Sequence, residues 1–114
     1  MDRVVAAVGR RGIDRFARID HAGGARSAGL ELDDEEVLVF GDPRVGTLLM
    51  QSDPAIGYEL PLRVLVWTRG GATHVGYRPA SDLASRYAVA GRAEVLARMD
   101  ALLGQIVAEA AGGE

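Results

Sequence analysis

Two short segments of the chain carry residue types that can bind a polar ligand or move a proton. The first is Asp20-His21, at the end of a segment that reads as a strand. A histidine beside a carboxylate is suited to acid–base catalysis or to binding a metal. Successive strand residues point to opposite faces, however, so Asp20 does not automatically orient His21. A polar strand end that faces water is the simpler interpretation of this pair.

The second segment, FGDPRVGTLLMQ, spans residues 40–51, and a strand is expected to end there as a short helix begins. Free backbone N–H groups at such a junction can hold an anion. The candidate ligand-binding residues here are Gly41, Asp42, Gly46, Thr47 and Met50. We expect Thr47 to cap the helix and Asp42 to orient a polar ligand. The segment lacks the lysine and the spacing of a P-loop and does not fit a dinucleotide fingerprint. A turn that fixes the direction of the chain is the alternative.

Other reactive combinations are poorly supported by the sequence. His21 and His74 with one aspartate would complete a two-histidine, one-carboxylate metal set, but spacing does not assemble them, so no metal site is predicted. The chain has no cysteine, which excludes a thiol nucleophile, a disulfide and a thiolate zinc site. No serine lies in a nucleophile-elbow motif. The sequence identifies no cofactor, and it leaves open whether the protein is an enzyme.

Composition limits the classes of partner. The 114 residues suffice for one domain, and all thirteen basic residues are arginine against sixteen acidic residues, for a net charge of −3. The absence of lysine excludes a Schiff-base lysine. The acidic balance argues against nucleic acid and anionic membranes as partners. No apolar run is long enough to cross a bilayer, and the first residues do not read as a signal peptide. We therefore predict a cytoplasmic protein.

The order of the expected elements indicates how these segments are held. A helix capped by Asp2 is expected to end before Gly12, and Val37 to Phe40 is expected to be a strand buried on both faces. The other expected elements are a strand over 13–21, a short helix or loop over 22–29, a helix over 45–51, a hairpin of strands 62–68 and 73–77 around Gly70-Gly71, and a helix over 82–88 capped by Ser81.

The last helix has the clearest pattern. Apolar residues recur at helical period from Val95 to Ala110, and Gly112-Gly113 ends the helix. This stripe needs a partner, which is either the sheet of its own subunit or a second subunit. We predict a single α+β domain over residues 1–114, with a four-stranded, mostly antiparallel sheet, helices packed on one face and a long C-terminal helix.

Three stretches together resemble a known family. FARIDHAGGARSAGLEL, VLVFGDPRVGTLLMQSDPAIGYELPLRVLVW and VGYRPASDLASRY resemble the bacterial family of domains of unknown function numbered 302. The resemblance covers Asp2 to Val89, so that residues 90–114 look like a C-terminal helical extension of a core over 1–89. Asp42 stands where that family usually has asparagine. The resemblance implies a small α+β domain, often a homodimer, and it implies no reaction.

Three functional hypotheses follow. The first is a homodimeric, non-catalytic module that binds a small molecule or anion near Asp20, His21 and the turn over 41–50. The second is a protein–protein assembly module that uses the amphipathic C-terminal helix. The third is an enzyme in which His21 acts as acid or base. The sequence does not identify the ligand, the pathway, or whether the last helix packs within the subunit or across a dimer.

Overall fold

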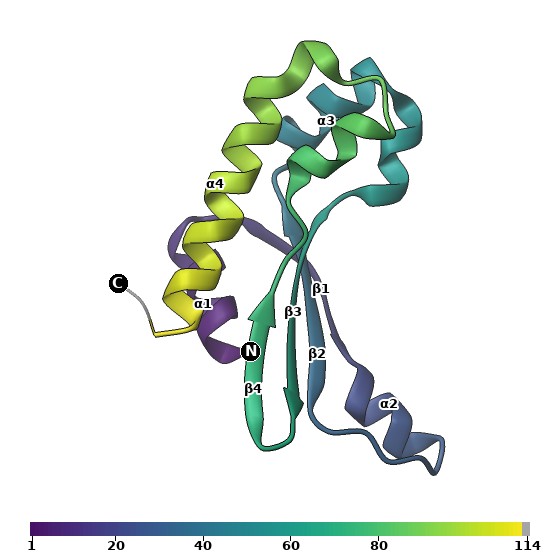
Figure 1. Ribbon diagram of the computed structural model, residues 1–114, viewed down its shortest axis with the longest axis vertical. Coiled ribbons are helices and arrows are strands. Elements are labelled where there is room, and N and C mark those ends of the chain that lie inside the picture. The colour runs from purple at the N-terminus through teal and green to yellow at the C-terminus, as the bar shows by residue number, and fades with distance from the viewer. Residues whose placement is uncertain (113–114) are drawn as a thin grey trace.

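The protein is an α+β domain built on one antiparallel sheet, as the computed structural model in Figure 1 shows for residues 1–112, the part of the chain that the structure describes. Gly113 therefore lies outside the described residues. The elements in chain order are α1 (Asp2–Arg10), β1 (Asp14–Asp20), α2 (His21–Ser27), β2 (Glu35–Gly41), α3 (Pro43–Ser52), the 3-10 helix η1 (Pro54–Glu59), β3 (Leu62–Arg69), β4 (Ala72–Gly76), the 3-10 helices η2 (Ala80–Ser85) and η3 (Ala90–Arg92), and α4 (Ala93–Ala110).

The four strands are ordered β1-β2-β3-β4, and every neighbouring pair is antiparallel. This confirms the predicted sheet. Gly70 and Gly71 join β3 to β4 with φ values of +59° and +81°. A two-residue turn of this kind needs positive φ at both positions, which glycine adopts without steric cost. The predicted hairpin is therefore present, and its turn explains why two glycines occur together.

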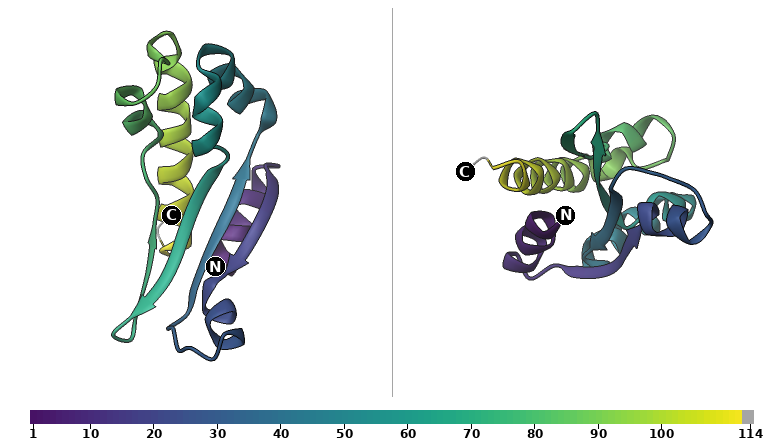
Figure 2. Two further views of the ribbon diagram at one scale, coloured as in Figure 1. Left: turned by 90° about the vertical axis from the view of Figure 1, so that its right-hand side faces the viewer. Right: turned by 90° about the horizontal axis from the view of Figure 1, so that it is seen from below.

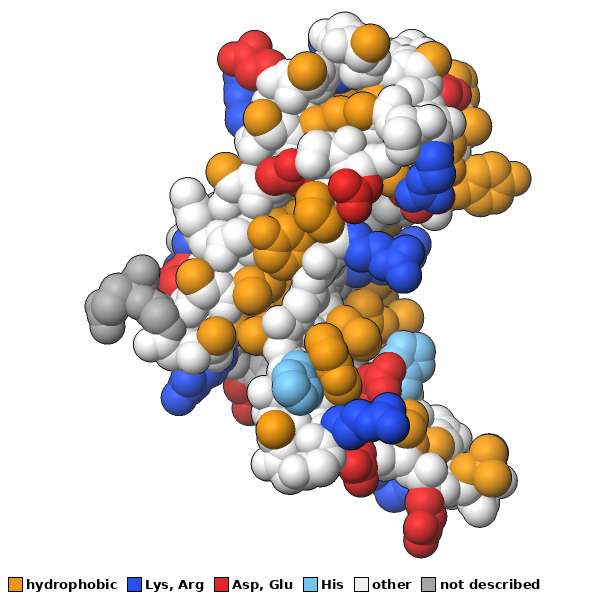
Figure 3. Space-filling view, in the orientation of Figure 1, with side chains coloured by type: hydrophobic (Ala, Val, Ile, Leu, Met, Phe, Trp, Pro, Cys, Tyr) orange, Lys and Arg blue, Asp and Glu red, His pale blue; other side chains and the backbone are white. Residues whose placement is uncertain are grey.

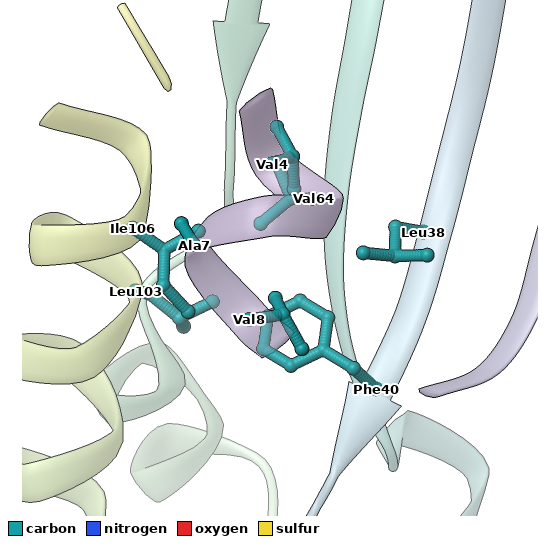
Figure 4. Close-up of a cluster of buried hydrophobic side chains, with 8 residues drawn as sticks. All are labelled: Val4, Ala7, Val8, Leu38, Phe40, Val64, Leu103 and Ile106. Atoms are coloured by element: carbon teal, nitrogen blue, oxygen red, sulfur yellow. The ribbon is translucent and has the colours of Figure 1, made fainter. Parts of the chain in front are cut away.

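One face of the sheet is covered by α1 and α4, which supply the main core (Figure 4). The buried members of this cluster are Val4, Ala7, Val8, Leu38, Phe40, Val64, Leu103 and Ile106. A second cluster lies beyond the end of the sheet, where the first half of α4 packs against α3 and the 3-10 helices (Figure 2). Leu62 contacts both clusters and marks their boundary.

The apolar stripe of α4 is buried within its own subunit. Leu103 and Ile106 are 1% and 0% exposed against α1 and the sheet, while Leu96 is 3% exposed in the second cluster. Two ion pairs also connect α4 to the end of α1, because Glu109 pairs with Arg10 at 2.8 Å and with Arg11. The stripe therefore packs within its own subunit, and the hypothesis that the C-terminal helix binds another protein stays a prediction.

Within residues 1–112, the opposite face of the sheet carries no long helix. In the view from below, α1 and α4 lie on one side of the strands and the short α2 lies on the other (Figure 2). Leu38 and Phe40 of β2 are buried, whereas Val37 and Val39 are half-buried. The prediction that β2 is buried on both faces is therefore wrong, because alternate residues of one strand meet different environments.

Two predicted helix starts also differ from the structure. Met1 is the N-cap of α1, and Asp2 lies in the first turn without capping it. The helix expected over 82–88 is the 3-10 helix η2, and Ser81 lies within it. The backbone N–H of Ser81 donates to the Asp100 carboxylate of α4 at 3.2 Å. This contact ties η2 to α4 across nineteen positions of sequence, which local pattern cannot reveal.

Candidate ligand-binding site

The two predicted site segments lie at opposite ends of β2. Asp20 pairs with Glu36 near the start of β2, whereas Asp14 pairs with Gly41 at its end. Five strand steps separate Glu36 from Gly41, which corresponds to about 17 Å at about 3.4 Å per residue. One small ligand cannot contact both segments, so each has to be considered as a separate site.

The Asp20-His21 pair does not form an acid–base couple. Asp20 is the N-cap of α2, and its Oδ1 accepts a hydrogen bond from the Gly23 backbone N–H at 2.9 Å. Its Oδ2 also lies 3.9 Å from Arg26. Within residues 1–112 the His21 ring makes no hydrogen bond, so no carboxylate orients it. Asp20 starts a helix, and His21 lies exposed at the edge of the open sheet face.

At the start of α3, the backbone N–H groups that could bind an anion already donate to Asp42. The Asp42 side chain caps α3 by accepting from the Arg44 N–H at 2.9 Å, and its carbonyl accepts from Val45 and Gly46 at 2.9 and 3.0 Å. The backbone donors of the first turn are thus already used. The Arg44 guanidinium, 3.0 Å from Oδ2, lowers the pKa of the Asp42 carboxyl and keeps it charged. The prediction that Thr47 caps this helix is wrong, because Thr47 lies inside it.

A cavity of about 380 Å³ lies beside this turn, between α3 and α4, where β1 begins, β2 ends and β3 begins. Its lining consists of Ile13, Phe16, Gly41, Asp42, Pro43, Val45, Met50, Gly57, Leu60, Pro61, Leu62, Arg98, Met99 and Leu102. We call this cavity the pocket. Among these residues Asp42 and Arg98 carry charges, and the others present carbon or sulfur. Of the predicted residues, Gly41, Asp42 and Met50 line the pocket, while Gly46 and Thr47 do not.

An irregularity in β1 brings an aromatic ring to the pocket. The register between β1 and β2 shifts from Arg15 to Ala17, which leaves Phe16 as the extra residue of a β-bulge. A bulge of this kind re-aims a side chain relative to the pleat. The Phe16 ring remains 52% exposed. The imperfect alternation of apolar residues in this strand was the sequence signal that could have identified the bulge.

Two glycines allow the segments that line the pocket to approach one another closely, because a side chain at either position would contact a neighbouring residue. A methyl group at Gly41 would lie 3.3 Å from Cβ of Pro61 and 3.9 Å from the Phe16 ring. A methyl group at Gly57 would lie 3.5 Å from the sulfur of Met50. The remaining wall comes from α4, whose residues Arg98, Met99 and Leu102 were not predicted as site residues. Their positions at the pocket depend on tertiary packing, so no local sequence motif indicates them.

The open face of the sheet forms a second, larger concavity, which we call the groove (Figure 3). Its volume is about 1030 Å³. The apolar floor consists of Ile19, Val37, Val39, Leu65 and Trp67. The Trp67 ring stacks on His74 of the neighbouring strand, with ring centres 5.2 Å apart.

The edge of the groove is charged. The polar lining residues are His21, Glu59, Arg63, Arg78, Asp82, Ser85 and Arg86. Glu59 accepts a hydrogen bond from the Tyr87 hydroxyl at 2.8 Å and lies 3.3 Å from Arg86. The Tyr87 hydrogen bond and the Arg86 charge lower the pKa of the Glu59 carboxyl. This carboxylate is therefore already engaged by neighbours of its own chain.

Across residues 1–112, no three His, Asp or Glu side chains converge in a way that could hold a metal ion. None of the helices in that range is both long and apolar enough to cross a membrane.

Three comparisons place the chain among known proteins. The family described as "Domain of unknown function DUF302" matches residues 1–106, which takes in most of α4 beyond residue 89. A crystal structure of an uncharacterized conserved protein DUF302 from Bacillus stearothermophilus has the same fold, with a TM-score of 0.80 and 16% identity over 96% of this chain and 86% of that chain.

The curated relatives match over a shorter region. Proteins named fluoride-specific ion channel FluC 1, from Brucella suis and Brucella abortus, are 44% identical over 70 residues, or 61% of this chain. The match spans 28% and 26% of their respective lengths, so this chain corresponds to about a quarter of each.

Proposed function

The chain belongs to the DUF302 family of domains of unknown function, and we propose that it is a non-catalytic module that binds a small, largely apolar molecule in the pocket. The observation that carries this proposal is a cavity of about 380 Å³ with an apolar wall and two charged groups. Ligand sites typically have about 300–1,000 Å³, mostly hydrophobic lining and a few polar groups.

The exposure of large apolar side chains at the pocket favours an apolar ligand. Protein interiors are packed about as densely as organic crystals, and voids larger than a water molecule are few. Here Phe16 remains 52% exposed and Met50 remains 36% exposed, and both line the pocket. An apolar ligand that covers them removes hydrocarbon surface from water, which is favourable by roughly 25 cal/mol per Å².

The charges at the pocket favour a ligand with one acidic end. Arg98 is exposed, and its nearest carboxylate, Glu94, lies 3.5 Å away and is itself exposed. Asp42 is engaged by Arg44 through two side-chain hydrogen bonds of 3.1 and 3.0 Å. The guanidinium of Arg98 is therefore the group best placed to meet an anionic end, while the methionines and leucines contact the hydrocarbon body.

The remaining hypotheses receive less support. An enzyme needs a positioned acid or base, and His21 has no orienting partner within the described residues. The pocket is lined by residues of a single chain, so ligand binding there does not require a homodimer. Fluoride, the ion in the names of the Brucella relatives, fits poorly, because a small anion in an apolar pocket loses its hydration without enough donors.

The test is calorimetric titration with alkyl carboxylates from hexanoate to dodecanoate, with the matching alcohols and sodium fluoride in parallel. Each added CH₂ contributes about 0.8 kcal/mol, or about fourfold in affinity, until the pocket is full. We expect Leu102→Phe, which fills the pocket, to weaken binding at least about tenfold. The matched variant Leu65→Phe lies on the groove floor and is expected to bind as wild type does.

Two results would contradict the proposal. The first is the absence of binding heat for every carboxylate and alcohol at concentrations where the series predicts saturation. The second is an equal loss of affinity in both phenylalanine variants, which would place the ligand outside the pocket.

A further inference from the structure

Two arginines lie at one end of the groove, where β3 begins and the chain leaves β4. Leu65 of β3 pairs with Gly76 of β4. Extending this antiparallel register by two residues places Arg63 opposite Arg78, and both arginines are exposed and line the groove. Residues two apart on a strand lie on the same face of a sheet. The open face of the sheet therefore ends in two neighbouring guanidinium groups, which we call the arginine pair.

The arginine pair has no acidic partner of its own in the described chain. Among residues 1–112, neither Arg63 nor Arg78 forms an ion pair. Glu59, which also lines the groove, already accepts from Tyr87 and pairs with Arg86. Like charges that lie opposite each other on neighbouring strands destabilise a sheet. An anion bound between the two guanidinium groups would remove that repulsion.

The net charge of this end of the groove remains positive when every lining residue is counted. Its arginines are Arg63, Arg78 and Arg86, and its acidic residues are Glu59 and Asp82. The Tyr87 hydrogen bond and the charges of Arg86 and Arg63 lower the pKa of the Glu59 carboxyl. Glu59 is thus charged and held by groups of its own chain, and an anionic ligand finds the arginine pair beside it.

The donors of the arginine pair suit a phosphate group. A guanidinium can donate two parallel N–H hydrogen bonds to phosphate oxygens. A phosphate monoester carries nearly two negative charges at about pH 8 and offers three acceptor oxygens. It can therefore accept from both arginines and balance both charges. A carboxylate has two oxygens and one charge, so it satisfies the pair less completely.

The surface beside the arginine pair suits an apolar body attached to that phosphate. Val39 pairs with Arg63 across the sheet, and Leu65 lies two residues along β3 from Arg63, about 7 Å at roughly 3.4 Å per residue. Both side chains are half-buried and belong to the groove floor. An aromatic ring that covers them removes apolar surface from water. The concavity of about 1030 Å³ has room for such a molecule, since small-molecule sites reach about 1,000 Å³.

We propose that this end of the groove binds a small phosphate monoester, whose phosphate lies between Arg63 and Arg78 and whose aromatic body covers Val39 and Leu65. This site is distinct from the pocket, because none of these four residues lines the pocket. The proposal therefore stands or falls independently of ligand binding in the pocket.

The experiment is calorimetric titration at about pH 8, where a phosphate monoester carries nearly two charges, with phenyl phosphate, methyl phosphate and benzoate. We expect phenyl phosphate to bind wild type at least about tenfold more tightly than methyl phosphate, which lacks the ring, and benzoate, which lacks the second charge.

Paired variants locate the site. Arg63→Gln with Arg78→Gln removes both charges at similar side-chain size and is expected to weaken phenyl phosphate binding at least about tenfold. The matched control is Arg15→Gln, at an exposed strand arginine that lines neither cavity and forms no ion pair within residues 1–112, and it is expected to bind as wild type does. Leu102→Phe, which fills the pocket, is also expected to leave phenyl phosphate binding unchanged.

Four results would overturn the proposal. Phenyl phosphate that does not bind wild type removes the site, and equal binding by the double glutamine variant removes the role of the arginine pair. A loss of affinity in Leu102→Phe alone would place phenyl phosphate in the pocket. Benzoate or methyl phosphate that binds as tightly as phenyl phosphate would contradict the ligand class.

Discussion

Replacing Leu103 by alanine tests whether α4 is part of the core or an addition to it. Leu103 is 1% exposed and packs in the cluster formed by α1, α4 and the sheet, with Phe40 at 0% exposure in the same cluster. Comparable leucine-to-alanine replacements cost about 3–5 kcal/mol, the lost transfer energy plus the cavity. A domain of this size holds about 5–15 kcal/mol of stability, so the replacement removes a large share of it.

The assay is thermal unfolding followed by circular dichroism. At about 4 °C per kcal/mol, Leu103→Ala is expected to lower Tm by about 12–20 °C. Leu102, its neighbour on the same helix, is half-buried against the pocket, and Leu102→Ala is expected to cost less than half as much. A Tm within about 2 °C of wild type for Leu103→Ala would refute the reasoning, because replacing a buried leucine by alanine lowers the stability by much more than that.

Three further predictions concern the cap, a turn and an ion pair. Asp42→Ala is expected to lower the free energy of unfolding by about 1 kcal/mol in urea titrations, whereas Asp42→Asn keeps the α3 cap and changes it little; equal losses would contradict the capping role. Gly71→Ala is expected to cost about 1–2 kcal/mol because φ is +81°, while Gly24→Ala, within α2 and with no atom within 4 Å of the added methyl, is expected to be neutral or stabilising. The pKa of the Glu109 carboxyl is lowered by its hydrogen bonds and charge interactions with Arg11 and Arg10. The charged carboxylate therefore stabilises the folded state at pH values above the ordinary pKa of 4.5, and this stabilisation is lost as the pH falls below that value. The stability gap between wild type and Glu109→Gln is therefore expected to be largest at neutral pH and to close in acid, and a gap that does not change with pH would contradict this linkage.

The fold was predictable where the signal is local. The Gly70-Gly71 hairpin depends on two adjacent residues, and the stripe of α4 depends on a period repeated over five turns. The burial of β2 was not predictable in the same way. Val37 and Leu38 are equally apolar, and which of them is covered depends on where α1 and α4 pack.

The candidate site was partly predictable. The turn that holds Gly41 and Asp42 does border the pocket, since a strand end followed by a helix start leaves a concave corner. The local sequence predicted an anion there, but the Asp42 side chain and carbonyl themselves accept from the first backbone N–H groups of α3. The other walls come from β1, η1 and α4, and Leu102 lies about sixty residues from Asp42 in sequence, which no spacing rule can relate.

The central claim, that the pocket binds a largely apolar ligand, is tested most directly by nuclear magnetic resonance of the methionine methyl groups. The chain has three methionines, of which Met50 and Met99 line the pocket and Met1 does not. With methyl-labelled methionine and increasing decanoate, we predict that the Met50 and Met99 signals shift together along one saturable curve while the Met1 signal stays in place. Unchanged Met50 and Met99 signals at saturating decanoate, or equal shifts of all three, would contradict the account.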